Sequence, residues 1–198
     1  MQALLAQSRR SLHSGAIDEL AMLKRYKHRP AHLLLDKTDY FITSSIYQKR
    51  ELLNDTLKTQ LIALLRQAFA EFRWTLEHWV VLNNHYHLMA FSDKGTDLPK
   101  IIARVHYQSG QLIRSVCSSD LPVWWNYWDY CPRNEQDYFV RLNYLLNNPI
   151  KHGYTKNLFD YPFSSFHQHI EKVGKEELRR QFSDHNKYRS LILSEDDF

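Results

Sequence analysis

The segment from Asn83 to Met89 constrains the fold most, because it places two histidines two positions apart inside an apolar run. Successive side chains of a β-strand alternate between its two faces, so a strand here presents His85 and His87 on one face and Tyr86 on the other. Two neutral imidazoles on one strand face can share a divalent metal ion, which then needs one or two oxygen ligands from elsewhere. The segment therefore predicts a sheet with a two-histidine edge.

Strand-like and helical patterns alternate along the rest of the chain. Strands are expected at residues 31–47 (interrupted at 36–39), 74–82, 85–91 and 123–130. Helices are expected at residues 55–73, 97–116, 135–147 and 175–182. Asn54 or Asp55 can cap the first helix, and Asn134 the third. Pro149 biases Asn148 away from the helical region, so the third helix is expected to end there.

This order of segments lacks the long strand–helix–strand rhythm of a parallel sheet. We therefore expect an α+β fold of ferredoxin-like character, in which helices cover an antiparallel sheet. The predicted domain spans residues 31–170. A basic helical arm at residues 1–30 precedes it, and a charged tail at residues 171–198 follows it.

Composition narrows the class of protein. With 198 residues, of which 43% are hydrophobic and 14% aromatic, the chain can bury a core and is expected to be globular. Its 26 Lys and Arg exceed 22 Asp and Glu, which is a weak indication of a polyanionic partner. Cys117 and Cys131 fit neither a zinc site nor a disulfide framework. No signal peptide or membrane span of about 18 apolar residues is evident, so a cytoplasmic location is expected.

A second motif runs from Tyr144 to Pro149. In a helix Tyr144 and Asn148 lie four residues apart and share a face. Asn148 can add an oxygen ligand to the imidazoles of His85 and His87, which leaves positions for water and phosphate oxygens around Mg²⁺ or Mn²⁺. Tyr144 would then be the nucleophile toward a phosphodiester. A phenol of pKa about 10 needs assistance for such an attack at pH 7.

These motifs resemble a known family. Asn84 to Leu88 resembles the His-hydrophobe-His signature of the single-tyrosine HUH transposases, and the tyrosine motif resembles their tyrosine helix. The resemblance to the REP-associated tyrosine transposase branch rests on Tyr144, Asn148, Pro149, Lys151 and Gly153, and on the segment 161–165. Two positions depart from the family pattern: Asn83 replaces a common proline, and Trp125 replaces a frequent glutamine.

The resemblance implies a bacterial, nucleoid-associated enzyme that cleaves and rejoins single-stranded DNA at imperfect palindromic hairpins, in DNA transposition or REP-element processing. It implies that His85, His87 and Asn148 bind Mg²⁺ or Mn²⁺, and that Tyr144 forms a 5′-phosphotyrosine intermediate. It also implies that the protein works as a monomer or a homodimer. The residues expected to contact DNA are Arg25, Lys27, Arg29, Lys100, Arg104, Arg114 and Lys151.

Other interpretations remain open at this point. A His-x-His pair is by itself more often structural than catalytic, and most of the twelve tyrosines must be packing or surface residues. The same fold can serve a non-catalytic regulator that binds DNA hairpins, or a metal-dependent hydrolase in which water is the nucleophile. The aromatic run at residues 123–130 fits sheet packing better than a platform for unpaired bases, although exposed rings there would suit such bases.

Overall fold

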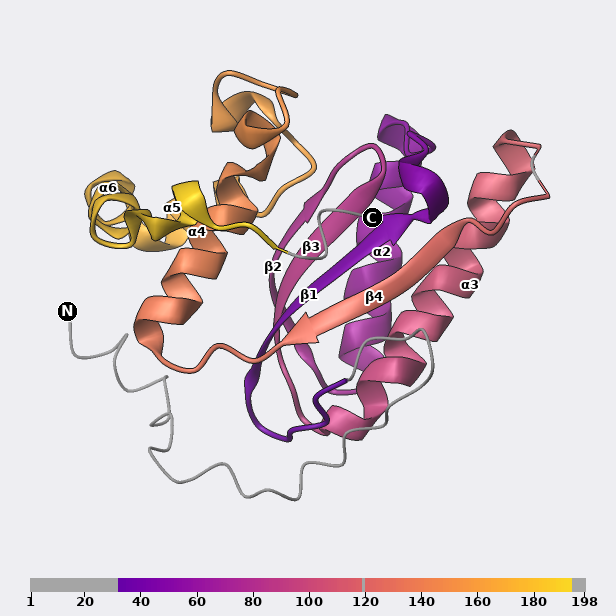
Figure 1. The fold of residues 1–198 in the computed structure, drawn as a ribbon, viewed down its shortest axis with the longest axis horizontal. Coiled ribbons are helices and arrows are strands. Elements are labelled where there is room, and N and C mark those ends of the chain that lie inside the picture. Colours follow the sequence, from indigo (N-terminus) through magenta and orange to yellow (C-terminus); the bar gives the residue numbers. More distant parts are fainter. Residues whose placement is uncertain (1–31, 119, 194–198) are drawn as a thin grey trace.

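The computed structural model describes residues 32–118 and 120–193, so the arm predicted at residues 1–30 lies outside it. Four strands form an antiparallel sheet in the order β2-β3-β1-β4 (Figure 1). The strands are β1 (Asp39–Ile46), β2 (Thr75–Val81), β3 (His85–Phe91) and β4 (Trp124–Tyr130). Helix α2 (Asp55–Glu71) follows β1, and α3 (Leu98–Val116) follows β3. This strand order, with those two helices as crossovers, is the ferredoxin-like arrangement that the sequence predicts.

The two faces of the sheet bury different helices. On one face, Tyr40, Ile42 and Tyr86 pack in a core cluster with residues of α2 and α3. On the other face, Phe41 and Met89 pack with residues of α4 (Glu135–Lys151). Because side chains alternate along a strand, the burial of Tyr86 against α2 and α3 turns its two histidine neighbours toward the face that α4 covers.

Strand β1 begins at Asp39, so the strand expected from residue 31 is wrong in its first half. The Tyr40 hydroxyl instead holds the preceding segment: it accepts a hydrogen bond from Leu35 N at 2.6 Å and lies 3.0 Å from Leu33 O. These hydrogen bonds to the Tyr40 hydroxyl take the place of the backbone hydrogen bonds that a strand would form with its neighbour. The expected helices over 55–73 and 97–116 and the strand over 85–91 are confirmed to within two residues at each end.

Helix α4 continues through Pro149 to Lys151, so the expected end at Asn148 is wrong. Proline lacks an N–H and cannot donate to the carbonyl four residues earlier, but it stands in the last turn, where one lost bond is tolerated. The turn is closed beyond it, because His152 N donates to Asn148 O at 3.0 Å and Tyr154 N donates to Pro149 O at 2.9 Å. Asn148 therefore stays helical, one turn after Tyr144.

The C-terminal helices pack against α4. They are α5 (Phe166–Val173), α6 (Lys175–Asp184) and the short 3₁₀ helix η4 (Asn186–Ser190). Buried Gln181 of α6 donates to Asn143 Oδ1 at 2.6 Å, and Asn143 Nδ2 donates to Gln181 O at 3.0 Å. The helix expected at residues 175–182 is thus confirmed, and the predicted domain boundary at residue 170 falls within α5.

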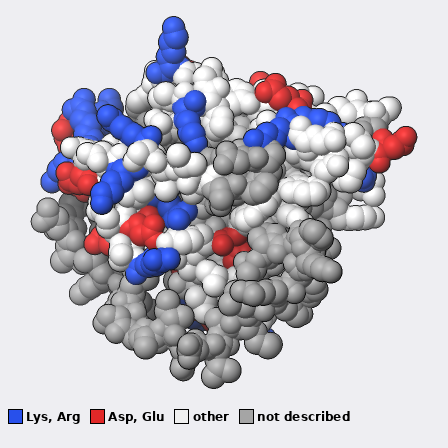
Figure 2. Space-filling view, in the orientation of Figure 1, with Lys and Arg blue, Asp and Glu red and all other residues white. Residues whose placement is uncertain are grey.

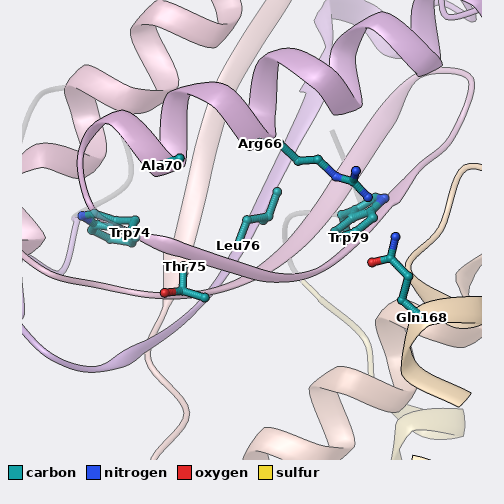
Figure 3. Close-up of a pocket in the computed structure, with 7 residues that line it drawn as sticks. All are labelled: Arg66, Ala70, Trp74, Thr75, Leu76, Trp79 and Gln168. Carbon is teal, nitrogen blue, oxygen red and sulfur yellow. The ribbon is translucent and has the colours of Figure 1, made fainter. Parts of the chain in front are cut away.

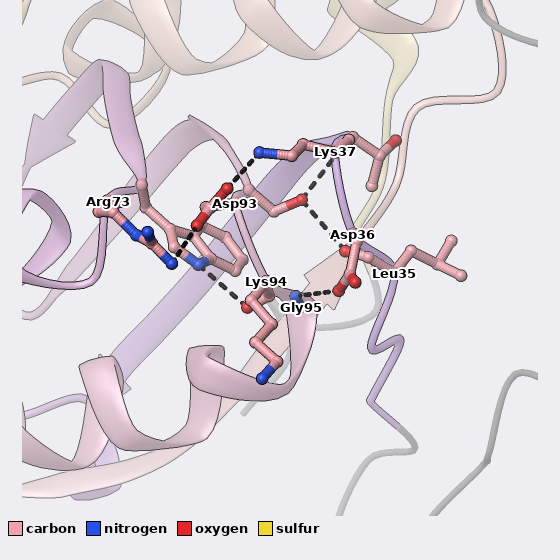
Figure 4. Close-up of polar contacts among 10 residues, drawn as sticks. Leu35, Asp36, Lys37, Arg73, Asp93, Lys94 and Gly95 are labelled. Carbon is pink, nitrogen blue, oxygen red and sulfur yellow. Dashed lines mark hydrogen bonds and ion pairs between the residues drawn. The ribbon is translucent and has the colours of Figure 1, made fainter.

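A polar cluster lies just beyond Phe91, at the end of β3 that is farther from His85 (Figure 4). Asp93 forms ion pairs with Lys37 and, at 3.0 Å, with Arg73. Gly95 N donates to Asp36 Oδ1 at 2.7 Å, and a Cβ at Gly95 would lie only 2.4 Å from the Leu34 carbonyl carbon. This close backbone contact requires glycine.

Of the helices that the structure describes, none has both the length and the apolar character needed to cross a bilayer.

Candidate active site

The two histidines of β3 lie on the face that α4 covers. Their ring centroids are 5.1 Å apart, and His87 is fully buried. Thr43 of β1 stands opposite His87 in the strand register, with its hydroxyl 2.8 Å from His87 Nδ1. This contact fixes the plane of the His87 ring and leaves Nε2 as the atom that points to the site.

The His85 ring is oriented by the turn that precedes β3. Asn84 Nδ2 donates to Lys49 O at 3.1 Å, which turns Asn84 Oδ1 toward His85 Nδ1 at 2.6 Å. An amide oxygen accepts, so the hydrogen-bond network assigns the proton to His85 Nδ1 and a lone pair to Nε2. That nitrogen faces Asn148 Oδ1 at 3.3 Å. Two acceptor atoms thus face each other.

The donor set fits a hard divalent cation. Ligand atoms about 2.1 Å from one ion in adjacent octahedral positions lie about 3 Å apart, close to the distance between His85 Nε2 and Asn148 Oδ1. His87 Nε2 is buried and has no hydrogen-bond partner. Burial, followed by the nearby His85, lowers the pKa of His87 well below 6.5, so its ring is neutral at pH 7 and keeps a free lone pair.

The amide completes a set that histidines alone do not supply. Among residues 32–118 and 120–193, His, Cys, Asp and Glu side chains form no group of three that could hold a metal ion. The candidate ligands are two imidazoles from β3 and the Asn148 oxygen from α4. Such a centre depends on the packing of that helix against the strand.

Tyr144 lies beside the histidine pair. Its side chain is almost fully buried, with the ring centroid 5.4 Å from that of His87 and 6.3 Å from that of Phe41. Lys151 Nζ donates to the Tyr144 hydroxyl at 2.7 Å and lies 4.4 Å from the ring centroid. The structure therefore places Lys151, which the sequence suggested as a DNA contact, on the candidate nucleophile.

His152 is a further neighbour, which the sequence did not place at the site. It caps the C-terminus of α4, and its ring centroid lies 5.0 Å from that of His85. A helix extended by one turn past Asn148 would have predicted both neighbours, because Lys151 then falls two turns after Tyr144 on the same face. Neither Lys151 nor His152 was predicted to lie at the site, because Pro149 was expected to end the helix.

The other suggested DNA contacts do not gather at this site. Lys100, Arg104 and Arg114 belong to α3, on the opposite face of the sheet. Lys100 pairs with Asp97 at 2.8 Å and Arg104 with Glu71 at 2.6 Å. Arg25, Lys27 and Arg29 lie outside the described residues. Where Figure 2 shows described residues, Lys and Arg side chains stand with acidic side chains among them.

A cavity of about 480 Å³ lies elsewhere, between α2, β2 and α5 (Figure 3). The Arg66 guanidinium stacks 4.5 Å from the centroid of the Trp79 ring there, and Gln168 lies at the same wall. None of the candidate ligands lines this cavity, and neither does Tyr144. The chemistry-bearing side chains are therefore packed between β3 and α4, not around this cavity.

Comparison with known proteins shows what the chain is similar to. Residues 35–128 match the family model described as "Transposase IS200 like". This segment, just under half of the chain, is therefore similar to the IS200-like transposases. The matched segment contains the two histidines of β3, whereas Tyr144, Asn148 and Lys151 lie beyond its end.

Two curated relatives are similar over most of their length. An Escherichia coli K12 REP-associated tyrosine transposase is 27% identical over 138 residues, covering 67% of this chain and 79% of the relative. A Haemophilus influenzae protein assigned to the same group is 25% identical over 151 residues, covering 66% and 85%. A solved REP-associated tyrosine transposase bound to a REP hairpin has a TM-score of 0.61 and 23% identity, covering 74% of this chain and 86% of that one. The chain shares the fold of that transposase.

Proposed function

We propose that this protein is a metal-dependent endonuclease and strand transferase that acts on single-stranded DNA at imperfect palindromic hairpins. The observation that carries the proposal is the buried, unpartnered Nε2 of His87 beside the ring of Tyr144. This nitrogen is a candidate metal ligand, and it lies next to the residue that would act as the nucleophile. The similar solved transposase is bound to a REP hairpin, which supports a DNA hairpin as the substrate. The proposed location is the bacterial nucleoid.

In this proposal His85, His87 and Asn148 hold Mg²⁺ or Mn²⁺, which when bound polarises the scissile phosphate. The Tyr144 oxygen attacks the phosphorus, the bond to the 3′ oxygen breaks, and the phenol proton passes to that oxygen directly or through an intervening group. One DNA end is released as a 3′ hydroxyl, and the other stays on Tyr144 through its 5′ phosphate. Because the phosphodiester energy is conserved in this linkage, the reverse step joins strands without ATP.

Lys151 supports the nucleophile. Its ammonium group donates to the Tyr144 hydroxyl at 2.7 Å, so it holds the oxygen in one place and favours negative charge on it. Burial of Tyr144 against Phe41 and His87 limits the rotation of the ring. The chain thus positions the attacking atom before DNA binds.

The test uses hairpin oligonucleotides with unpaired flanks, labelled at the 5′ or the 3′ end, with and without Mg²⁺ or Mn²⁺. Wild-type protein is expected to cleave and to retain the fragment that carries the 5′ phosphate, only when the metal is present. His87→Ala and Asn148→Ala are expected to lose at least 100-fold in cleavage rate. His167→Ala, a histidine that bonds Phe159 O away from the site, is the matched control and is expected to cleave normally.

The alternatives give different results in the same assay. Cleavage that releases both fragments without an adduct would identify a hydrolase in which water attacks. Hairpin binding without cleavage under all metal conditions would identify a binding protein that has the transposase fold. Either result would overturn the proposed function.

A further inference from the structure

Strand β4 begins with two tryptophans in opposite environments. The Trp124 ring stacks on His106 at 4.6 Å and contacts Tyr86, on the face covered by α2 and α3. The Trp125 side chain is 42% exposed, and its ring centroid lies 5.1 Å from that of Tyr47 at an angle of 38°. The register of β1 with β4 shifts here, between Ser44 and Ile46. An aromatic pair is therefore presented at this end of the sheet.

This pair is tied to the candidate active site through one short turn. Tyr47 opens the 3₁₀ helix η1 (Tyr47–Lys49), whose last carbonyl accepts the hydrogen bond from Asn84 Nδ2. Asn84 in turn orients His85. Tyr47 N also donates to Val123 O at 2.8 Å, two residues before Trp125. In Figure 1 the end of β1 and the start of β4 lie side by side.

The turn adopts a costly backbone conformation. Gln48 and Lys49 have φ values of 59° and 52°, in the left-handed region that non-glycine residues rarely occupy. Such conformations persist where the surrounding structure requires them, and they cluster at functional sites. Here they let η1 contact Trp125 through Tyr47 and Asn84 through Lys49.

We propose that Tyr47 and Trp125 form a stacking platform for one unpaired base of the DNA strand, close to the phosphate that Tyr144 attacks. The inference rests on the proposed function, because it places a nucleotide of that substrate. Aromatic rings stack on bases of any sequence, and a basic surrounding attracts the backbone. Arg50 supplies positive charge beside Tyr47, because its guanidinium donates to Tyr47 O at 2.9 Å and to Pro122 O, and Lys49 lies between Gln48 and Arg50 in the same turn. An exposed tryptophan beside a half-buried tyrosine, with a cation next to them, fits a nucleotide better than an apolar protein surface.

The test is a binding measurement in the Tyr144→Phe background, where the proposed cleavage cannot occur. The ligand is a hairpin with unpaired flanks in which each unpaired nucleotide is replaced in turn by an abasic one. The reference protein is expected to lose about tenfold in affinity at one position near the cleavage site. Adding Trp125→Ala is expected to cost about tenfold on the intact hairpin and to abolish the penalty at that position.

Three further variants separate stacking from folding. Trp125→Phe keeps a ring and is expected to retain most of the affinity, while the quenching of tryptophan fluorescence by the oligonucleotide decreases. Tyr47→Ala is expected to reproduce part of the Trp125→Ala loss at the same abasic position. Tyr107→Ala removes a ring that is 69% exposed on α3, and it is expected to leave affinity unchanged. Unfolding temperatures of all variants check that the fold persists.

The platform is refuted if Trp125→Ala leaves the pattern of abasic penalties unchanged, or if Tyr107→Ala weakens binding equally. A failure of the platform can be distinguished from a failure of the proposed function. A position-specific penalty in a protein that forms no adduct would refute cleavage and keep the platform. Adduct formation without any penalty dependent on Trp125 would keep the function and refute the platform.

Discussion

At the residue scale, the candidate site depends on atoms that fix the orientation of its side chains. Thr43 and Asn84 each bond the Nδ1 of one histidine, so that both Nε2 atoms face α4. Partners of this kind fix the tautomer of metal-binding histidines and raise their affinity for the metal. The proposed cation site therefore includes β1 and the β2–β3 turn as well as its three ligands.

Thr43→Val removes the hydroxyl with almost no change in shape. We expect the Mn²⁺ concentration for half-maximal cleavage to rise by about tenfold, because the His87 ring loses the contact that orients it. A titration of cleavage rate against Mn²⁺ measures this. Thr59→Val is the control, since the Thr59 hydroxyl bonds only the exposed helical carbonyl of Asp55. An equal shift in both variants would contradict the assignment.

Lys151→Met keeps the length of the side chain and removes its charge and donors. Because Lys151 Nζ bonds the Tyr144 hydroxyl, we expect adduct formation to slow by about tenfold to 100-fold. Hairpin affinity should fall much less. Lys156→Met, on an exposed lysine after α4, is the matched control. If Lys151→Met weakened binding and left the rate at saturating DNA unchanged, Lys151 would be a DNA contact only.

The sequence predicted those site residues whose positions follow from simple periodicity. Strand alternation placed His85 with His87, and helical spacing placed Tyr144 with Asn148. The positions of Lys151 and His152 beside the site were not predicted, because Pro149 was expected to end the helix, whereas α4 continues to Lys151. The exposure of Trp125 was also beyond prediction, because a register shift breaks alternation within a run of aromatic residues.

At the element scale, the structure explains why two glycines behave differently. Gly95, at the start of the 3₁₀ helix η2 (Gly95–Asp97), lies against the backbone of residues 34 and 35. Gly110 lies inside α3, where a Cβ would meet nothing within 4 Å. The sequence alone does not distinguish them, because the contact at Gly95 joins segments about 60 residues apart.

Gly95→Ala is expected to lower the free energy of unfolding by about 2 kcal/mol, because its Cβ overlaps backbone atoms that cannot move independently of β1. Gly110→Ala is expected to raise it by about 0.5–1 kcal/mol, since alanine is the better helix former. Urea denaturation measures both. Equal effects of the two substitutions would contradict the packing of residues 34 and 35 on the η2 turn.

At the scale of the whole molecule, buried neutral histidines link stability to pH. Burial lowers the pKa of His106 to about 3, where it bonds Tyr86 and stacks on Trp124. In the unfolded chain a histidine has a pKa of about 6.5. Between these two values the unfolded state binds one proton more than the folded state, so stability is lost as pH falls below about 6.5.

We therefore expect the free energy of unfolding to decrease from pH 7 to pH 5, and His106→Gln to reduce the slope by about 1 kcal/mol per pH unit. Urea denaturation at several pH values, on both proteins, measures the two slopes. His87 contributes to the slope in the same direction, because its pKa is also lowered by burial. Identical slopes would show that His106 is protonated equally in both states.

In the proposed reaction Tyr144 becomes covalently linked to DNA. The direct measurement is mass spectrometry of tryptic peptides after incubation with a hairpin oligonucleotide and Mg²⁺ or Mn²⁺. Residues 142–151 form one such peptide, in which Tyr144 is the only tyrosine. We predict that it gains the mass of the fragment bearing the 5′ phosphate in wild-type protein and in Tyr138→Phe, but not in Tyr144→Phe. An adduct on another peptide, or one that persists in Tyr144→Phe, would contradict the account.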